Sequence, residues 1–384
     1  MSATTGAALS RGVIGRLLAF CLLLTACASP NRIELLEPAA SAADSASDEA
    51  GLIMQFDSYE RELAQSPSVV RDSELNRYLQ ELSCRVAGEF CAGIRVYLVR
   101  QPYFNAQVAP NGMLIIWTGL LLRVEDEAQL AAVIGHEVGH YVGRHSLAHW
   151  RKLKSTNELT LALHLLGGGL IGGVASLGAY GDMFAFSRQQ EREADDYGLK
   201  RLRELGYDDR RVGQLWGDIW DETQMRDKNL LSSIFSAHPA SAERRDRLIA
   251  AATGQSERRE AAAYWRAIKA QRGGWLQDEI GRRHYAQTEV LLARLLGLSQ
   301  AKAETEYFAA EMYRRRAREG DFVRARDAYR KAIAEGGAPP ESWRGLGLVQ
   351  QQLGEKQAAM DAWSTYLQLS PEAEDRAVIE SWLQ

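Results

Sequence analysis

Apolar residues recur at helical spacing between residues 130 and 141. They follow the i, i+3, i+4, i+7 pattern of an amphipathic helix and comprise Leu130, Val133, Ile134, Val138 and Tyr141. Glu137 falls on the same face, so the pattern predicts a helix that turns a carboxylate toward the core. A buried carboxylate needs a cation or hydrogen-bond donors beside it.

Two histidines, His136 and His140, flank Glu137 in the pattern H-E-x-x-H. Helical positions four residues apart lie about 40° apart around the axis, so both imidazoles can bind one metal ion. Glu137 lies about 60° from His140 and can reach a water molecule on that ion, which makes it the expected general base. We expect one Zn²⁺ ion per chain at this site.

The third protein ligand can come from either of two patterns. In the longer motif H-E-x-x-H-x-x-G-x-x-H the ligand stands ten residues after the first histidine, where this chain has Ser146. His145 comes one residue early and, if the helix continues, points about 180° away from His136. The other pattern takes a glutamate from a second helix.

A second helix is predicted to begin at Ser187, because Ser187 and Gln190 form a capping box. In this helix Glu191 and Asp195 lie one turn apart on one face, whereas Glu193 points elsewhere. We therefore expect Glu191 to bind the metal and Asp195 to accept a hydrogen bond from a ligating imidazole.

Two signals before the metal-binding helix predict local structure. Asn111 and Gly112 form a tight-turn signal ahead of an apolar run, which predicts a hairpin leading directly into that helix. Cys84 and Cys91 bracket a short loop between a helix that begins at Asp72 and a strand. In an oxidising compartment this pair is expected to form one disulfide, and two separately buried thiols are the alternative.

The N-terminus has the pattern of an export signal. Two arginines precede the apolar run 17–24, which is too short to span a bilayer stably and ends in Leu-Thr-Ala-Cys, like a bacterial lipobox. We expect residues 1–26 to be a lipoprotein signal peptide and Cys27 to carry acyl chains. An ordinary signal peptide is the alternative. Residues 27–50, rich in Ala, Ser and Asp, are expected to be a flexible tether.

The apolar stretch 159–180 is long enough for a membrane helix, but its glycine clusters and His164 argue against one. We expect an apolar segment over or beside the active-site cleft.

The C-terminal third is predicted to be helical. Residues 342–371 fit a tetratricopeptide register, and the residues that fit it are Trp343, Leu346, Gly347, Ala359, Trp363 and Pro371. The expected fold is therefore α+β, with a mostly helical zinc peptidase domain and a small sheet at 51–254 and an all-α repeat domain at 255–384. The repeat domain is expected to be a docking surface or a rigid cap.

Composition supports an ordinary globular protein of two domains, with 384 residues of which 46% are hydrophobic and 25% charged. The 46 basic residues are balanced by 50 acidic ones, and no basic patch points to nucleic acid.

The segments HEVGH and SRQQEREAD together resemble the gluzincin metallopeptidases of family forty-eight, the family of HtpX and the C-a-a-X prenyl-protein proteases. More narrowly, the chain is similar to its periplasmic, BepA-like branch. The family pattern E-x-x-A-D maps onto Glu191, Ala194 and Asp195. The resemblance also implies an edge strand near the zinc that pairs with an extended peptide.

The same resemblance implies a His-Pro pair followed by an arginine, which His238 and Arg244 match. His238 is expected either to donate to the oxyanion that develops during catalysis or to bind the open zinc position and keep the enzyme latent. Arg244 is expected to lie beside the metal ligands.

We expect a zinc endopeptidase that cleaves misfolded or stalled envelope proteins. The alternative is an outer-membrane assembly factor whose repeats bind clients or a protein partner, with proteolysis secondary. Ala28 after the lipidated cysteine implies a periplasmic protein anchored in the inner leaflet of the outer membrane.

Overall fold

The computed structural model describes residues 48–155, 186–225, 238, 241–298 and 300–383. The predicted signal peptide, most of the tether, Cys27 and the apolar stretch 159–180 lie outside the described residues. Within the described residues, no helix is long and apolar enough to cross a membrane.

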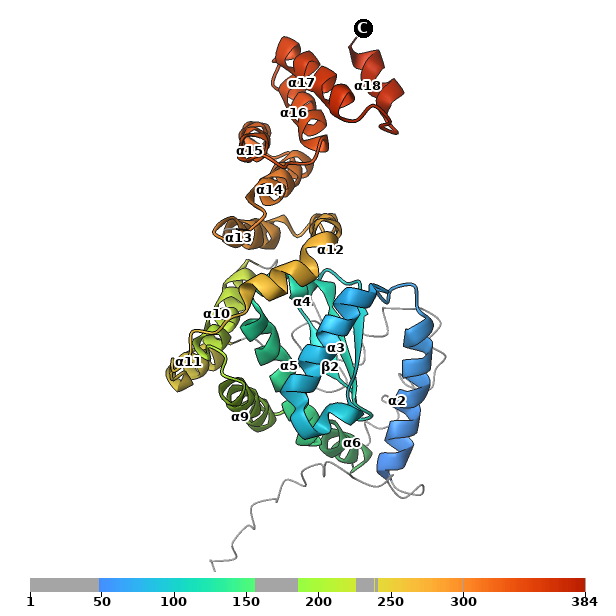
Figure 1. Cartoon of the computed structure of the whole chain (residues 1–384), viewed down its shortest axis with the longest axis vertical. Coiled ribbons are helices and arrows are strands. Elements are labelled where there is room, and N and C mark those ends of the chain that lie inside the picture. The colour runs from blue at the N-terminus through green and yellow to red at the C-terminus, as the bar shows by residue number, and fades with distance from the viewer. Residues whose placement is uncertain (1–47, 156–185, 226–237, 239–240, 299, 384) are drawn as a thin grey trace, which may run out of the picture. The chain divides into compact units, whose positions relative to one another are not determined.

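A small sheet of three strands lies among helices in the N-terminal half (Figure 1). Its strands are β1 (Arg95–Val99), β2 (Ala106–Val108) and β3 (Met113–Trp117), in the order β1-β3-β2. β2 and β3 form the predicted hairpin around Gly112, whose φ is +84°, and β1 pairs with β3 in parallel. The hairpin does not lead directly into the metal-binding helix, because the short helix α4 (Thr118–Arg123) intervenes.

Both faces of β3 are covered, since all five of its residues are buried. Leu114 and Ile116 pack into the main core with α3 (Ser73–Ala87) and α5 (Glu127–Val142). Met113, Ile115 and Trp117 pack into a second core with α2 (Asp48–Gln65) and α6 (His145–Ser155). In Figure 1 the strands run between α3 and α2. A strand buried on both faces reads as a continuous apolar run, as Met113 to Trp117 does.

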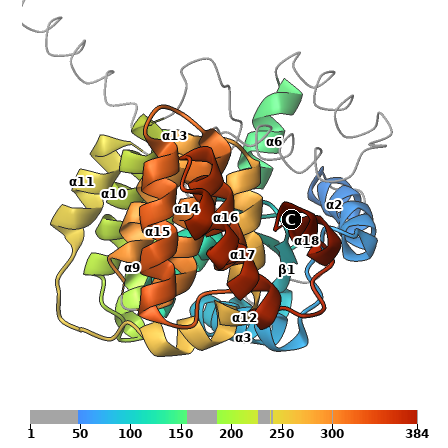
Figure 2. The ribbon, with the colours of Figure 1, turned by 90° about the horizontal axis from the view of Figure 1, so that it is seen from above.

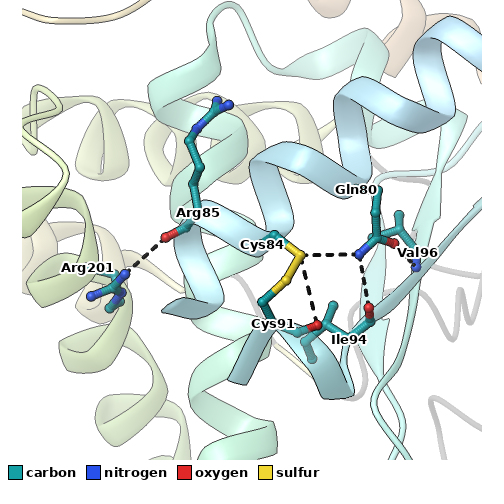
Figure 3. The surroundings of a disulfide bond; sticks show 7 residues. All are labelled: Gln80, Cys84, Arg85, Cys91, Ile94, Val96 and Arg201. Atoms are coloured by element: carbon teal, nitrogen blue, oxygen red, sulfur yellow. Dashed lines mark hydrogen bonds between the residues drawn. A yellow bond between two sulfur atoms is a disulfide. The ribbon is translucent and has the colours of Figure 1, made fainter. Parts of the chain in front are cut away.

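A disulfide joins Cys84, in the last turn of α3, to Cys91 in the 3-10 helix η1 (Gly88–Gly93) (Figure 3). Gln80, one turn earlier on α3, donates from Nε2 to the carbonyl of Ile94 and accepts from the N–H of Val96. The disulfide and this side chain together attach the end of α3 to the start of β1.

The predicted mostly helical α+β architecture is confirmed, and every described element after α6 is a helix. The helices α14 to α17 pack in succession, each against the next (Figures 1 and 2). The helices after α6 are α9 (Arg188–Glu204), α10 (Arg210–Gln224), α11 (Ala242–Ala251), α12 (Ala261–Gly281), α13 (Tyr285–Leu296), α14 (Lys302–Arg316), α15 (Asp321–Glu335), α16 (Glu341–Gln352), α17 (Lys356–Leu369) and α18 (Arg376–Trp382).

Helix α12 shares the core of the N-terminal half. Tyr264, Ile268, Trp275, Leu276 and Ile280 of this helix are buried in the same cluster as the apolar residues of α3 and α5. The all-α region is therefore continuous with the core of the N-terminal half through α12.

Candidate metal centre

Helix α5 is the central element of the site, and all of its residues except Tyr141 are buried. Its N-terminus is fixed by Asp126, whose side chain accepts a hydrogen bond from the N–H of Gln129. His136, Glu137 and His140 are respectively 4%, 3% and 1% exposed, so three polar side chains lie inside the protein. Each of them needs a partner there.

Helix α9 supplies partners for the two histidines because it approaches α5 very closely. A Cβ atom on Gly139 would lie 2.9 Å from the Cα of Ala194, so only glycine fits at this crossing. The predicted capping box is present at the start of α9, where Ser187 and Gln190 exchange hydrogen bonds. The close crossing brings Glu191, on the first turn of α9, to the two histidines of α5.

Four side chains converge on one point: His136, His140, Glu191 and His238. His136 Nε2 lies 3.1 Å from His140 Nε2 and 3.2 Å from His238 Nδ1. Glu191 Oε1 lies 3.4 Å from His140 Nε2 and 2.9 Å from His238 Nδ1. Two atoms that bind one tetrahedral zinc are separated by about 3.3 Å, because each stands 2.0–2.1 Å from the ion. These four separations are close to that value, and all four ligand atoms lie within 4.8 Å of one another, which suits one bound ion.

The chemistry of the four residues also fits zinc. Oε2 of Glu191 is buried, and although it lies 3.2 Å from Nη1 of Arg244, it has no donor in hydrogen-bond geometry among the described residues. Burial lowers the pKa of His136 to about 4, and it also lowers the pKa of His140, so both imidazoles are neutral at pH 7. Burial would raise the pKa of Glu191, but His238, His140 and His136 outweigh it and hold that pKa well below its usual range. Two neutral imidazoles and a carboxylate are ligands that zinc prefers.

Asp195 lies where it can orient the first histidine. Its Oδ1 is 3.0 Å from Nδ1 of His136 and accepts a hydrogen bond of 2.6 Å from Arg244. Its Oδ2 accepts a hydrogen bond of 2.6 Å from Arg247. A proton on Nδ1 of His136 leaves Nε2 free to bind a metal. Arg244 lies 3.7 Å above the ring of Trp216, which also contacts His136 edge-on.

Glu137 does not belong to the four converging side chains. Its Oε2 accepts a hydrogen bond of 3.1 Å from the N–H of Val108, on strand β2, and its Oε1 lies 3.8 Å from Nε2 of His238. Burial raises the pKa of Glu137 to about 7. A carboxylate with a pKa near neutrality can accept a proton and release it again at physiological pH.

Three neighbours of the site were not expected from the sequence. Phe186 stacks on the ring of His140, with centroids 4.0 Å apart, and Trp216 packs against Arg244. The helical pattern does not continue to His145, which instead contacts His140.

Comparison with known proteins agrees with this geometry. Residues 70–252 match the model of Peptidase family M48. The chain is 34% identical to the mitochondrial metalloendopeptidase OMA1 of Arabidopsis thaliana, over 47% of this chain and 35% of the relative. It is 32% identical to the metalloprotease LoiP of Escherichia coli (strain K12), over 41% of this chain and 62% of the relative. It is 26% identical to the beta-barrel assembly-enhancing protease of the same organism, over 48% of this chain and 40% of the relative.

The chain thus spans less than two thirds of the length of each of these relatives. Residues 70–252 form a metallopeptidase domain of family M48, and the resemblance noted from the two sequence motifs is confirmed. Zinc is the metal of this family, and the four converging side chains can hold one ion.

Proposed function

We propose that this M48 domain is a zinc endopeptidase of the bacterial cell envelope. The observation that carries the proposal is the position of Glu137. This buried carboxylate lies in the sequence between His136 and His140, two of the three histidines of the four-residue cluster, and stands outside the cluster itself. Such a carboxylate has no ligand role to fulfil, so its place beside the metal suits proton transfer.

His136, His140 and Glu191 would hold the ion. A zinc ion at this place supplies a Lewis acid that polarises the scissile carbonyl and activates water for attack. Glu137 accepts the proton of the attacking water and passes it to the nitrogen of the leaving amine. The N–H of Val108 holds the Glu137 carboxylate in place through the hydrogen bond to Oε2.

Strand β2 suits the binding of an extended peptide. It stands at one edge of the sheet, since among the described strands it pairs only with β3. Its Val108 contacts the proposed base directly, so a peptide added along β2 passes beside the metal centre. Backbone pairing tolerates many side chains, which is what a protease for unfolded proteins requires.

The cellular role is proposed from three further features. The lipobox ending at Cys27 favours a periplasmic lipoprotein in the inner leaflet of the outer membrane. One relative is named a beta-barrel assembly-enhancing protease, which favours misfolded or stalled envelope proteins as substrates. The successive packing of α14 to α17 and the repeat register at 342–371 favour tetratricopeptide-like repeats.

The repeats also support the alternative function, that of an assembly factor that binds clients and cleaves them only secondarily. In the α16–α17 pair, a Cβ on Gly347 would lie 2.3 Å from the indole nitrogen of Trp363, so the two predicted repeat positions pack directly together. A helical array of this kind is a docking surface for a protein partner.

The deciding experiment measures zinc content and casein cleavage for the full-length protein in detergent, with Glu137→Gln beside the wild type. We expect one zinc per chain in both proteins and cleavage by the wild type alone. A Glu137→Gln variant that still cleaves casein would refute the role of Glu137. A variant that is inactive but fully functional in cells would favour the assembly role.

A further inference from the structure

The second histidine of the cluster, His140, is linked to a carboxylate through another histidine. Nδ1 of His140 lies 2.9 Å from Nδ1 of His145, and Nε2 of His145 lies 3.2 Å from Oε2 of Glu193. His145 is 3% exposed, so its imidazole nitrogens have to find their partners inside the protein.

The protonation pattern along this line follows from the role of His140. If Nε2 of His140 binds the metal, the proton of that neutral ring is on Nδ1 and is donated to Nδ1 of His145. His145 is then the tautomer with its proton on Nε2, and it donates this proton to Glu193. Gln189 donates to the other oxygen of Glu193 at 3.0 Å, which fixes the carboxylate. Every contact in the line has one donor and one acceptor.

The chain reversal after α5 places His145 against His140. Helix α5 ends at Val142, Arg144 has a left-handed φ of +51°, and α6 begins at His145 itself. A Cβ atom on Gly143 would lie 2.5 Å from Nε2 of His145, so the imidazole occupies the space that any other residue at 143 would fill. The turn thus folds His145 back onto the end of the metal-binding helix.

Helix α9 supplies one carboxylate for each of the two histidines of α5. His136 contacts Asp195 directly, whereas His140 contacts Glu193 through His145. On its other side, the ring of His140 is stacked by Phe186, with an angle of 26° between the planes. Stacking restricts the tilt of the ring. A hydrogen bond to Nδ1 also opposes a rotation of the ring by 180° about Cβ–Cγ, which would place carbon atoms where the two nitrogens stand.

We propose that His145 and Glu193 are positioning residues that fix the tautomer and ring orientation of His140 for metal binding. The proposal deepens the proposed function and rests on it, because it presumes that His140 is a zinc ligand. Loss of such a hydrogen bond beyond a metal ligand typically weakens metal affinity about tenfold to hundredfold.

The test measures the zinc dissociation constant of the full-length protein in detergent by competition with a chromogenic chelator. His145→Phe keeps a ring but removes the acceptor, and His145→Asn keeps an acceptor at the place of Nδ1. We expect the dissociation constant to rise about tenfold to hundredfold in His145→Phe and to return to within about threefold of the wild type in His145→Asn. If His145 acted only through packing, His145→Phe would bind zinc more tightly than His145→Asn, because phenylalanine conserves the ring volume better.

Glu193→Ala provides a second test that does not depend on the folding of His145→Phe. Its matched control is Arg192→Gln, which removes an exposed ion pair with Glu243 from the neighbouring position of α9. We expect zinc affinity to fall severalfold in Glu193→Ala and to stay unchanged in Arg192→Gln. Wild-type affinity in Glu193→Ala, or equal losses in His145→Phe and His145→Asn, would overturn the proposal. A wild-type protein that binds no zinc would instead refute the proposed function itself.

Discussion

The Nδ1 atom of His238 lies 2.9 Å from Oε1 of Glu191, which places His238 in the fourth corner of the proposed zinc site. A catalytic zinc needs one position open for water or substrate. A histidine in that corner competes with the substrate, so the geometry favours a latch over an oxyanion donor. The side chain of His238 is 10% exposed and lies among the proposed ligands.

For His238→Ala we therefore expect faster casein cleavage with unchanged zinc content. If binding of His238 to the open position is favourable by about 1.4 kcal/mol, it suppresses turnover tenfold. We therefore expect the cleavage rate to rise about tenfold in the variant. Cleavage rate and bound zinc are measured on the same preparation. A fall in cleavage would assign His238 to transition-state stabilisation, and an unchanged rate would make it a structural residue.

Glu191→Ala is expected to reduce bound zinc to the level of His136→Ala. Three protein ligands are the minimum for a catalytic zinc site, and each variant removes one of the proposed three. Metal analysis after dialysis against a weak chelator measures the effect. If Glu191→Ala kept stoichiometric zinc, His238 would be acting as the third ligand, and the double variant with His238→Ala would then lose the metal.

Cys27→Ser is expected to release the protein into the soluble periplasmic fraction. A serine in the lipobox cannot be acylated as the cysteine is, so the variant loses its anchor. Multiple acyl chains are what makes such anchoring stable. Fractionation of cells expressing either form, followed by immunoblotting, gives the result. Recovery of the variant in washed membranes would show that another part of the chain anchors it.

Replacing both Cys84 and Cys91 by alanine is expected to lower the free energy of unfolding by about 2 to 3 kcal/mol, the chain-entropy value for so short a loop. The metal centre lies on other elements, so zinc content should not change. Urea unfolding of the double variant and of the wild type under oxidising conditions provides the comparison. A difference below about 0.5 kcal/mol would mean that the disulfide does not constrain the unfolded chain as the model assumes.

The sequence predicted those parts of the site that lie on one helix face. His136, Glu137 and His140 share α5. The four-residue spacing of Glu191 and Asp195 predicts one face of α9, where the structure has Glu191 at the cluster and Asp195 beside Nδ1 of His136. Helical periodicity carries this information because the geometry of a helix is fixed.

Periodicity could not predict the parts that depend on a chain reversal. His145 was expected to point away from His136 if the helix continued. Instead α5 ends at Val142, and the left-handed Arg144 turns His145 back toward His140. A single non-glycine residue in this conformation gives no sequence signal. Likewise, the parallel pairing of β1 with β3 depends on long-range packing between the two strands.

The core between α4, α10 and α12 contains a charge network that periodicity also could not show. Arg123, 2% exposed, donates to Glu222 at 2.5 Å and to Glu279 at 3.0 Å. Glu279 is fully buried and also accepts from Arg282 and from the hydroxyl of Thr288. Since Arg123 belongs to α4 and Glu279 to α12, this network attaches the first helix of the C-terminal region to the helix that follows the sheet.

Glu279→Gln is expected to destabilise the protein by about 3 to 5 kcal/mol, the usual effect of removing one partner from a buried ion pair. The adjacent Asp278 offers a matched control, because it pairs with the exposed Arg100, whose side chain is 57% exposed. Asp278→Asn should cost less than about 1 kcal/mol. Equal effects of the two variants in urea unfolding at pH 7 would show that burial of the network does not determine its contribution.

The difference between the wild type and Glu279→Gln should also depend on pH. Burial would raise the pKa of Glu279, but Arg123 and Arg282 outweigh it and hold that pKa below its usual value. Protons therefore bind the unfolded chain more readily than the folded one, so the carboxylate stabilises the fold above its unfolded pKa of about 4.3. This contribution is lost as the pH falls through the lower pKa of the folded state. Unfolding free energies measured between pH 7 and pH 3 should converge for the two proteins, and a constant difference would mean that the glutamate acts through packing and not through its charge.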